Sequence, residues 1–185
     1  MKQHRVVLGM AVSALLTFGG MALAQQTGQN ATSGTANRMS SADSTFANKA
    51  AQGGMAEVKL GELAKEKASS QAVKDFGQKM IDDHTKANDE LKQVAARDGI
   101  TLPTSIDAKD QATYDRLSKL SGAEFDKAYM RDMVSDHRTD VNEFKRESER
   151  GTNPNLKSFA AKTLPTLEQH LNMAESTEAQ VKSGK

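Results

Sequence analysis

Cysteine and tryptophan are absent from this chain of 185 residues, and aromatic residues make up only 4% of it. Without cysteine there is no disulfide, no thiolate metal ligand, no cysteine nucleophile and no lipid-anchored cysteine. Neither sign of charge is in excess, because 25 basic residues stand against 24 acidic ones with no long run of either. This balance argues against a dedicated nucleic-acid-binding protein, which normally has a basic face. The plentiful residues are Ala, Leu, Lys, Glu, Asp and Met, a composition typical of helices.

Residues 1–24 have the features of a secretory signal peptide. A basic segment with Lys2 and Arg5 precedes an apolar run over residues 6–18, and a small-x-small cleavage site ends at Ala24. The apolar run is too short for a membrane span, so we expect no integral span after cleavage. An uncleaved N-terminal anchor is the alternative. The sequence therefore predicts a periplasmic or otherwise exported protein.

The mature chain is predicted to consist of a disordered linker, residues 25–43, and one helical domain, residues 44–182. The linker is rich in Gln, Thr, Ser, Gly and Asn and has too few apolar residues to offset the entropy of ordering. Apolar residues then recur at helical spacing, and no stretch alternates convincingly at period two. The expected helices span residues 44–67, 71–97, 107–120, 123–150 and 153–182.

Four of these helices are long, and each has an apolar stripe that must be buried against the others. The fold class is therefore all-α, and we expect a four-helix bundle. The second and third long helices are joined by about 24 residues, which include the short extra helix. That crossover is long enough to return along the bundle, so these two helices could run parallel, as in the ferritin-like arrangement.

A five-residue pattern occurs twice, as Met80 to His84 and again 53 positions later as Met133 to His137. Both copies place a histidine on an apolar stripe, after an aspartate. Each of the four stripes in fact contains one ionisable residue, and counting from the loops puts all four near the middle of the bundle. These residues are Glu57, His84, His137 and His170.

Three imidazoles and one carboxylate form a suitable ligand set for one divalent ion such as zinc, copper, iron or manganese. Asp83 and Asp136 point about 100° away from the histidines that follow them. They could instead orient a histidine of a neighbouring helix as second-shell partners. The alternative needs no metal, because histidine and carboxylate side chains can satisfy one another as hydrogen-bonded pairs in a core.

Several methionines could offer thioethers to cuprous copper in an exported protein, although methionine at helical spacing more often fills gaps in a core. No nucleophile, base and orienting residue form a recognisable catalytic constellation, so the sequence does not indicate an enzyme. The methionines considered are Met55, Met80, Met130, Met133 and Met173.

The segment from about 45 to 181 resembles the DUF4142 family of exported bacterial proteins, which are often labelled outer membrane proteins and grouped with ferritin-like folds. The resemblance implies fold and export, possible association with the outer membrane, and no settled activity. An integral outer-membrane barrel would need alternating strands, which this chain lacks. The residues that carry the resemblance are Phe46, Ala56-Glu57 and Leu60-Gly61, then Phe76, Met80 and Asp83-His84, and finally Asp136-His137 and His170.

The chain departs from di-iron ferritins, whose paired Glu-x-x-His signatures are missing. Three residues before the histidines stand Ile81, Val134 and Leu167 instead of glutamates. Ferroxidase or iron-storage activity therefore does not follow from the fold. Two functions remain: a bundle that binds one metal ion for sequestration or envelope stress protection, and a non-catalytic structural protein with a metal-free polar layer. The second would act through a protein partner in the cell envelope.

Overall fold

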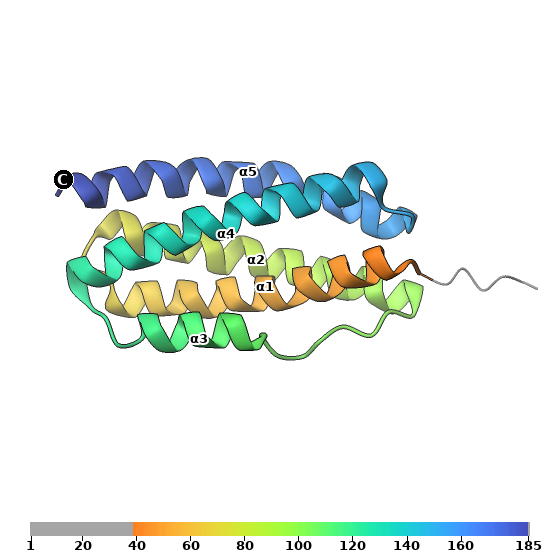
Figure 1. Cartoon of the computed structure of the whole chain (residues 1–185), viewed down its shortest axis with the longest axis horizontal. Coiled ribbons are helices and arrows are strands. Elements are labelled where there is room, and N and C mark those ends of the chain that lie inside the picture. Colours follow the sequence, from red (N-terminus) through yellow and green to blue (C-terminus); the bar gives the residue numbers. More distant parts are fainter. Residues whose placement is uncertain (1–38, 185) are drawn as a thin grey trace, which may run out of the picture. The chain divides into compact units, whose positions relative to one another are not determined.

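Every regular element of the computed structural model, which describes residues 39–184, is an α-helix (Figure 1). This agrees with the all-α class, and the observed helix bounds differ from the expected ones by three residues or fewer. The predicted signal peptide and most of the predicted linker, residues 1–38, lie outside the described residues. The helices are α1 Ser41–Lys67, α2 Gln71–Asp98, α3 Ala108–Leu117, α4 Gly122–Arg150 and α5 Pro154–Ser183.

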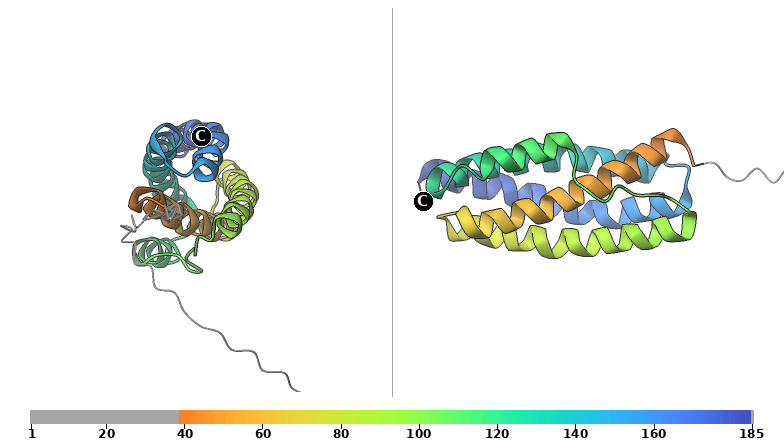
Figure 2. Two further views of the ribbon diagram at one scale, coloured as in Figure 1. Left: turned by 90° about the vertical axis from the view of Figure 1, so that its right-hand side faces the viewer. Right: turned by 90° about the horizontal axis from the view of Figure 1, so that it is seen from below.

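The four long helices form two antiparallel hairpins, α1–α2 and α4–α5, each closed by a three-residue loop. The hairpins pack side by side, with α1 against α4 and α5 against α2. The end-on view in Figure 2 shows the four helices around a common core. Because the crossover returns along the bundle, α2 and α4 run in the same direction (Figures 1 and 2).

The short helix α3 lies on the outside of the bundle, against α1 and α4. Asp107 caps its start, since the Asp107 carboxylate accepts a hydrogen bond of 2.8 Å from the backbone N–H of Asp110. The helix ends at Leu117 rather than at the expected Leu120, because the chain tightens into a turn. In that turn the N–H of Leu120 donates to the carbonyl of Leu117 at 3.0 Å.

The first helix begins three residues earlier than the sequence indicated, because Ser40 and Asp43 have structural roles that composition does not reveal. The hydroxyl of Ser40 accepts a hydrogen bond of 3.0 Å from the N–H of Asp43, which caps the helix. The carboxylate of Asp43 is buried and accepts hydrogen bonds from Thr152 and Asn153 in the α4–α5 loop. Residues 41–43 therefore belong to the bundle and not to the linker.

A polar layer divides the core into two apolar clusters. One cluster includes Phe76, Phe125 and Met133 and lies toward the α1–α2 loop. The other includes Phe46 and Leu156 and lies toward the α4–α5 loop. Between them, at positions that belong to neither cluster, are the four ionisable residues of the stripes, all buried: Glu57, His84, His137 and His170.

None of the helices in the described part of the chain is both long enough and apolar enough to cross a membrane.

Candidate metal centre

The three histidines of the polar layer come together from three different helices. His84 is on α2, His137 on α4 and His170 on α5. One ring nitrogen of each lies within 4.8 Å of a ring nitrogen of both others. The ring centroids are 5.4 to 5.8 Å apart, and all three side chains are buried. Residues 33 to 86 positions apart in the chain thus form one nitrogen cluster in the middle of the bundle.

The backbone of α4 fixes the tautomer of His137. Its Nδ1 lies 3.0 Å from the carbonyl oxygen of Met133, one turn earlier. A carbonyl only accepts hydrogen bonds, so Nδ1 must carry the proton and Nε2 must have the free lone pair. His137 Nε2 is buried and has no hydrogen-bond partner.

Asp83 fixes the tautomer of His170 in the same manner. The Nε2 atom of His170 lies 2.7 Å from Oδ2 of Asp83, so Nε2 donates and Nδ1 has the lone pair. His170 Nδ1 is also buried without a partner. Nζ of Lys79 pairs with the same oxygen, Oδ2 of Asp83, at 2.9 Å. The sequence suggested that Asp83 could orient a histidine of a neighbouring helix, and the structure places it against one.

All three imidazoles are held in the neutral form. Burial lowers the pKa of His84 well below its usual value, and the neighbouring His137 and His170 lower it further. Burial also lowers the pKa of His137 to about 4, and it lowers the pKa of His170 although Asp83 acts in the opposite direction. Nε2 of His84 is the third buried nitrogen without a partner. The layer thus presents three neutral rings, each with one unpartnered nitrogen.

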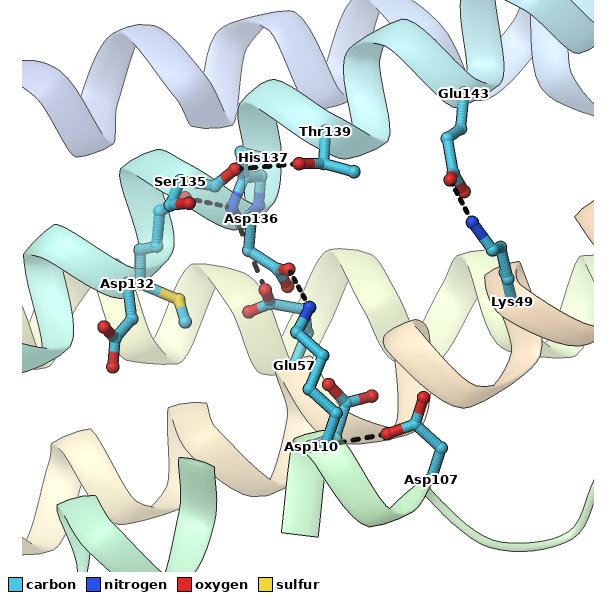
Figure 3. Close-up of polar contacts among 12 residues, drawn as sticks. Lys49, Glu57, Asp107, Asp110, Asp132, Ser135, Asp136, His137, Thr139 and Glu143 are labelled. Carbon is cyan, nitrogen blue, oxygen red and sulfur yellow. Dashed lines mark hydrogen bonds and ion pairs between the residues drawn. The ribbon is translucent and has the colours of Figure 1, made fainter. Parts of the chain in front are cut away.

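Glu57 lies beside this cluster and is not part of it. Its Oε1 is 3.8 Å from Nδ1 of His137, which is the nitrogen that donates to Met133 (Figure 3). Burial raises the pKa of Glu57 well above its usual value, and Asp136 and Asp140 raise it further. A protonated Glu57 beside a neutral His137 is not an ion pair. The structure thus brings three of the four predicted ligands together and leaves the fourth next to them.

Asp136 lies against Glu57 rather than against a histidine. Asp136 is close enough to raise the pKa of Glu57, although neither oxygen of Glu57 has a hydrogen-bond partner. The other neighbour of Asp136 is Lys109, at 4.0 Å. Consecutive side chains of an α-helix point about 100° apart around the helix axis. His137 points into the core, so the side chain of Asp136 points toward α1 and α3, which also pack against α4.

Two further carboxyls near Glu57 were not among the predicted site residues. Burial raises the pKa of Asp140 well above its usual value, and Asp136 and Glu143 add to the effect. Burial, together with Asp107 and Asp136, raises the pKa of Asp110 to about 6 (Figure 3). Asp140 is one helical turn after Asp136, which is a signal that the sequence contains. The position of Asp110 depends on how α3 docks, which no local pattern indicates.

Four of the five methionines considered as copper ligands are core or surface residues. Met80, Met130 and Met133 lie in an apolar cluster, and Met173 is exposed on α5. They are therefore placed as core and surface residues.

Comparison with known proteins supports the fold and leaves the activity open. One similar solved structure is described as "Crystal structure of DUF305 fragment from Deinococcus radiodurans". Its TM-score is 0.67 at 13% sequence identity, and the match covers 77% of this chain and 98% of that chain. At this identity the likeness shows the fold alone. A search among curated proteins finds no match.

A comparison with protein families finds a match over most of the chain. The family model described as "Domain of unknown function (DUF4142)" matches residues 26–177, which include every residue of the polar layer. The chain belongs to the DUF4142 family.

Proposed function

We propose that this protein binds one divalent transition-metal ion in the core of a ferritin-like four-helix bundle. The ligands are Nε2 of His84, Nε2 of His137 and Nδ1 of His170. The observation that carries the proposal is that these three buried nitrogens have no hydrogen-bond partner although they belong to rings that lie together. Buried polar atoms almost always have a hydrogen-bond partner. Three unpartnered nitrogens in one place therefore indicate a ligand that all three share.

The arrangement of the rings favours a cation over a hydrogen-bonded layer. Two of the three tautomers are set by acceptors outside the cluster, so the lone pairs of His137 and His170 remain available inside it. Two lone pairs cannot satisfy each other, whereas a metal ion accepts both. The Asp83–His170 pair also has the form of the carboxylate–histidine–metal arrangement that orients metal ligands.

The distances are compatible with a metal site. A zinc–nitrogen bond is about 2.0–2.1 Å, so two nitrogens on one zinc ion lie at most about 4.2 Å apart. Nitrogens within 4.8 Å of one another therefore need only a small inward movement of the rings. Imidazole suits zinc, copper, iron and nickel, while manganese prefers oxygen ligands. We expect zinc and cupric copper to bind best and manganese to bind worst.

Glu57 is outside the proposed ligand set because it faces the protonated nitrogen of His137. This assignment can be tested by comparing two buried substitutions in the same layer. His137→Ala removes a ligand, and Glu57→Gln keeps the size and removes the acidic group. We expect stoichiometric metal to be lost in the first variant and retained in the second.

The decisive experiment uses the untagged full chain, stripped with a chelator and dialysed against zinc, copper, cobalt or manganese. Elemental analysis should then find one zinc or copper ion per chain. Asp83→Asn should weaken zinc binding by about 10–100-fold, as for other partners of metal-bound histidines, and His170→Ala should weaken it more. Absence of stoichiometric metal, or equal loss in Glu57→Gln and His137→Ala, would overturn the proposal.

A thermal melt gives an independent test. An ion that binds only the folded state stabilises it by about 2.7 kcal/mol at a hundred times its dissociation constant. Zinc should therefore raise the melting temperature of the stripped protein, and a chelator should reverse the effect. If zinc leaves the melting temperature unchanged, the histidines form the metal-free polar layer of a structural envelope protein.

The role that fits such a site is metal sequestration in an exported compartment, which would protect the envelope from free metal. Export is the part of this proposal that depends on residues 1–24. It predicts that protein isolated from the periplasm has the intact mass of a chain beginning at Gln25. A chain that keeps its first residues, or that stays in the cytoplasm, would contradict it.

A further inference from the structure

Two neighbouring cavities lie beside His84. The outer one, of about 110 Å³, lies between α2 and α5 and is lined by both His84 and His170. The inner one, of about 20 Å³, lies within the bundle and is also lined by His84. The cavities share four lining residues, which places them next to each other: His84, Ala87, Thr163 and Leu167.

The inner cavity is of a size and polarity that suit one small molecule. A cavity of about 10–15 Å³ on this measure holds one water molecule, provided that polar groups surround it. Besides His84, the inner cavity is lined by Asn88, Asp140 and Thr163, from three different helices. Gly54 makes room for one of these groups. A Cβ atom at Gly54 would lie 2.1 Å from Oδ1 of Asn88, so any side chain there would displace the amide.

The outer cavity reaches the surface of the bundle, since two of its lining residues, Lys86 and Lys162, are exposed. Its mouth contains the ion pair between Lys162 and Glu90, with both Glu90 oxygens 2.8 Å from Nζ. The lysine is largely exposed, and exposed pairs of this kind contribute little to stability and exchange easily. The larger cavity of about 660 Å³, between α1, α2 and residues 104–111, touches none of the histidines.

We propose that the metal ion has an exchangeable fourth position that opens toward the inner cavity and takes water or a small inorganic anion. This rests on the three-histidine site proposed above. Three protein ligands leave one position of a tetrahedral ion free, which is the pattern of sites that exchange or react and not of closed structural sites. A doubly charged ion with three neutral ligands favours an anion as its fourth ligand. The α2–α5 cavity is the route by which that ligand enters.

The test uses the cobalt(II) form of the untagged full chain, because cobalt reports its ligands through visible absorption. Azide is the probe. We expect a saturable change in the cobalt spectrum on addition of azide, with cobalt still at one per chain. Ala87 lines both cavities, so Ala87→Leu obstructs the route. It should weaken azide binding by about tenfold or more, while cobalt stoichiometry is kept.

The control is Ala161→Leu, which makes the same chemical change on an exposed position of α5 that lines neither cavity. It should bind azide as the parent does. Thr163→Ile obstructs the same passage from α5, so agreement of the two obstructing variants separates blockage from local misfolding. A stoichiometric cobalt complex whose spectrum ignores azide would overturn this inference alone. The inference would also be overturned if Ala87→Leu and Thr163→Ile bound azide as tightly as Ala161→Leu does. If cobalt does not bind at all, the metal site and this inference fail together.

Discussion

The hairpins α1–α2 and α4–α5 close each other's loops by the same contact. Asp126, near the start of α4, accepts hydrogen bonds from the N–H groups of Ser69 and Ser70 at 3.1 and 2.9 Å. Asp43, near the start of α1, accepts from Thr152 and Asn153, both at 3.0 Å. The two aspartates are 83 positions apart in the sequence, and so are the two loops. The bundle is therefore an internal repeat in which an aspartate of each hairpin binds the loop of the other. These two contacts, of Asp126 with residues 69–70 and of Asp43 with residues 152–153, are the two clamps of the bundle.

The hairpins differ in how their two helices meet. In α1–α2 the backbones approach closely, since a Cβ atom at Gly61 would lie 2.6 Å from the carbonyl oxygen of Gly77. The residue 83 positions after Gly61 is Phe144, whose ring packs against Phe159 with centroids 5.9 Å apart. One hairpin is thus held by backbone contact and the other by aromatic side chains.

The histidines do not follow the repeat, and this difference makes the site. The positions that correspond to His137 and His170 in the opposite hairpin are Gly54 and Ala87. Both of these small residues line the inner cavity beside His84. His84 is matched by Leu167 instead, so small residues correspond to two of the three histidines and leave space next to the polar layer. The departures from the repeat supply the three histidines of the polar layer and the space beside His84.

Removing one clamp should have the largest effect on stability. Asp126→Ala removes the acceptor for two partly buried hydrogen bonds from backbone N–H groups and for the hydroxyl of Ser69. Hydrogen bonds to a charged acceptor contribute about 1.5–3 kcal/mol each and are not additive, so we expect a loss of about 3 kcal/mol in urea unfolding. At pH 8, where Glu147 is ionised, Asp43→Ala should cost about 1 kcal/mol less, because it relieves the repulsion between Asp43 and Glu147.

The control for both clamp variants is Asp75→Ala on the exposed face of α2, which should change stability by less than about 0.5 kcal/mol. If Asp43→Ala is as costly as Asp126→Ala, the two clamps are equivalent and the presence of Glu147 has no energetic consequence.

The close backbone contact of the first hairpin predicts the next effect. Gly61→Ala forces a methyl group against the backbone of Gly77, and overpacking of this kind costs about 1–3 kcal/mol. The gain in helix propensity, about 1 kcal/mol, offsets only part of that cost. Gly53→Ala is the matched control on the same helix, because a Cβ atom there meets nothing within 4 Å. Urea unfolding should show Gly61→Ala to be destabilised and Gly53→Ala to be stabilised by about 0.5–1 kcal/mol. Equal behaviour of the two would contradict the packing argument.

The helices could be predicted from the sequence because apolar spacing and terminal residues specify them locally. Gly99 ends α2 in the left-handed conformation, with a φ of 67°, and Pro154 opens α5. The start of α1 was missed because Ser41 to Asp43 looks like linker by composition. What makes that segment helical is the contact of Asp43 with a loop 109 positions away.

The meeting of the three histidines also followed from the sequence, since counting residues from the loops gives their height in the bundle. The failure of Glu57 to join them did not follow. Height was predicted correctly for Glu57, but its direction depends on the rotation of α1 against α4, which no local pattern encodes. The repeat that the sequence displays, 53 positions apart, relates the parallel helices α2 and α4. The repeat that organises the fold, 83 positions apart, relies on two aspartates and polar loop residues and is nearly invisible in the sequence.

The smallest expected effect concerns Glu147, which has no acidic counterpart in the other hairpin. The corresponding position there is Ala64. Burial, together with the neighbouring Asp43, raises the pKa of Glu147 to about 7. A carboxyl group whose pKa is higher in the folded state binds its proton more tightly there. The native protein therefore loses stability as the pH rises from the unfolded pKa, near 4.5, to about 7, and the loss persists above that pH.

Glu147→Gln removes this titration. The free energy of unfolding of the variant should therefore rise relative to that of the parent as the pH increases from about 4.5 to about 7. After a discount for the access of water to the carboxyl group, we expect a relative gain on the order of 1 kcal/mol at pH 8. Urea unfolding at pH 5 and at pH 8 measures it. Glu143→Gln, on the same helix, is the control for a change of one charge, since its ion pair with the exposed Lys49 lies near the surface. If the stability of the Glu147→Gln protein and that of the parent change in parallel between pH 5 and 8, the Asp43–Glu147 pair does not make the two aspartate contacts energetically different. The difference in cost between Asp43→Ala and Asp126→Ala would then need another cause, such as the position of Asp43 in the first turn of α1, where helices fray.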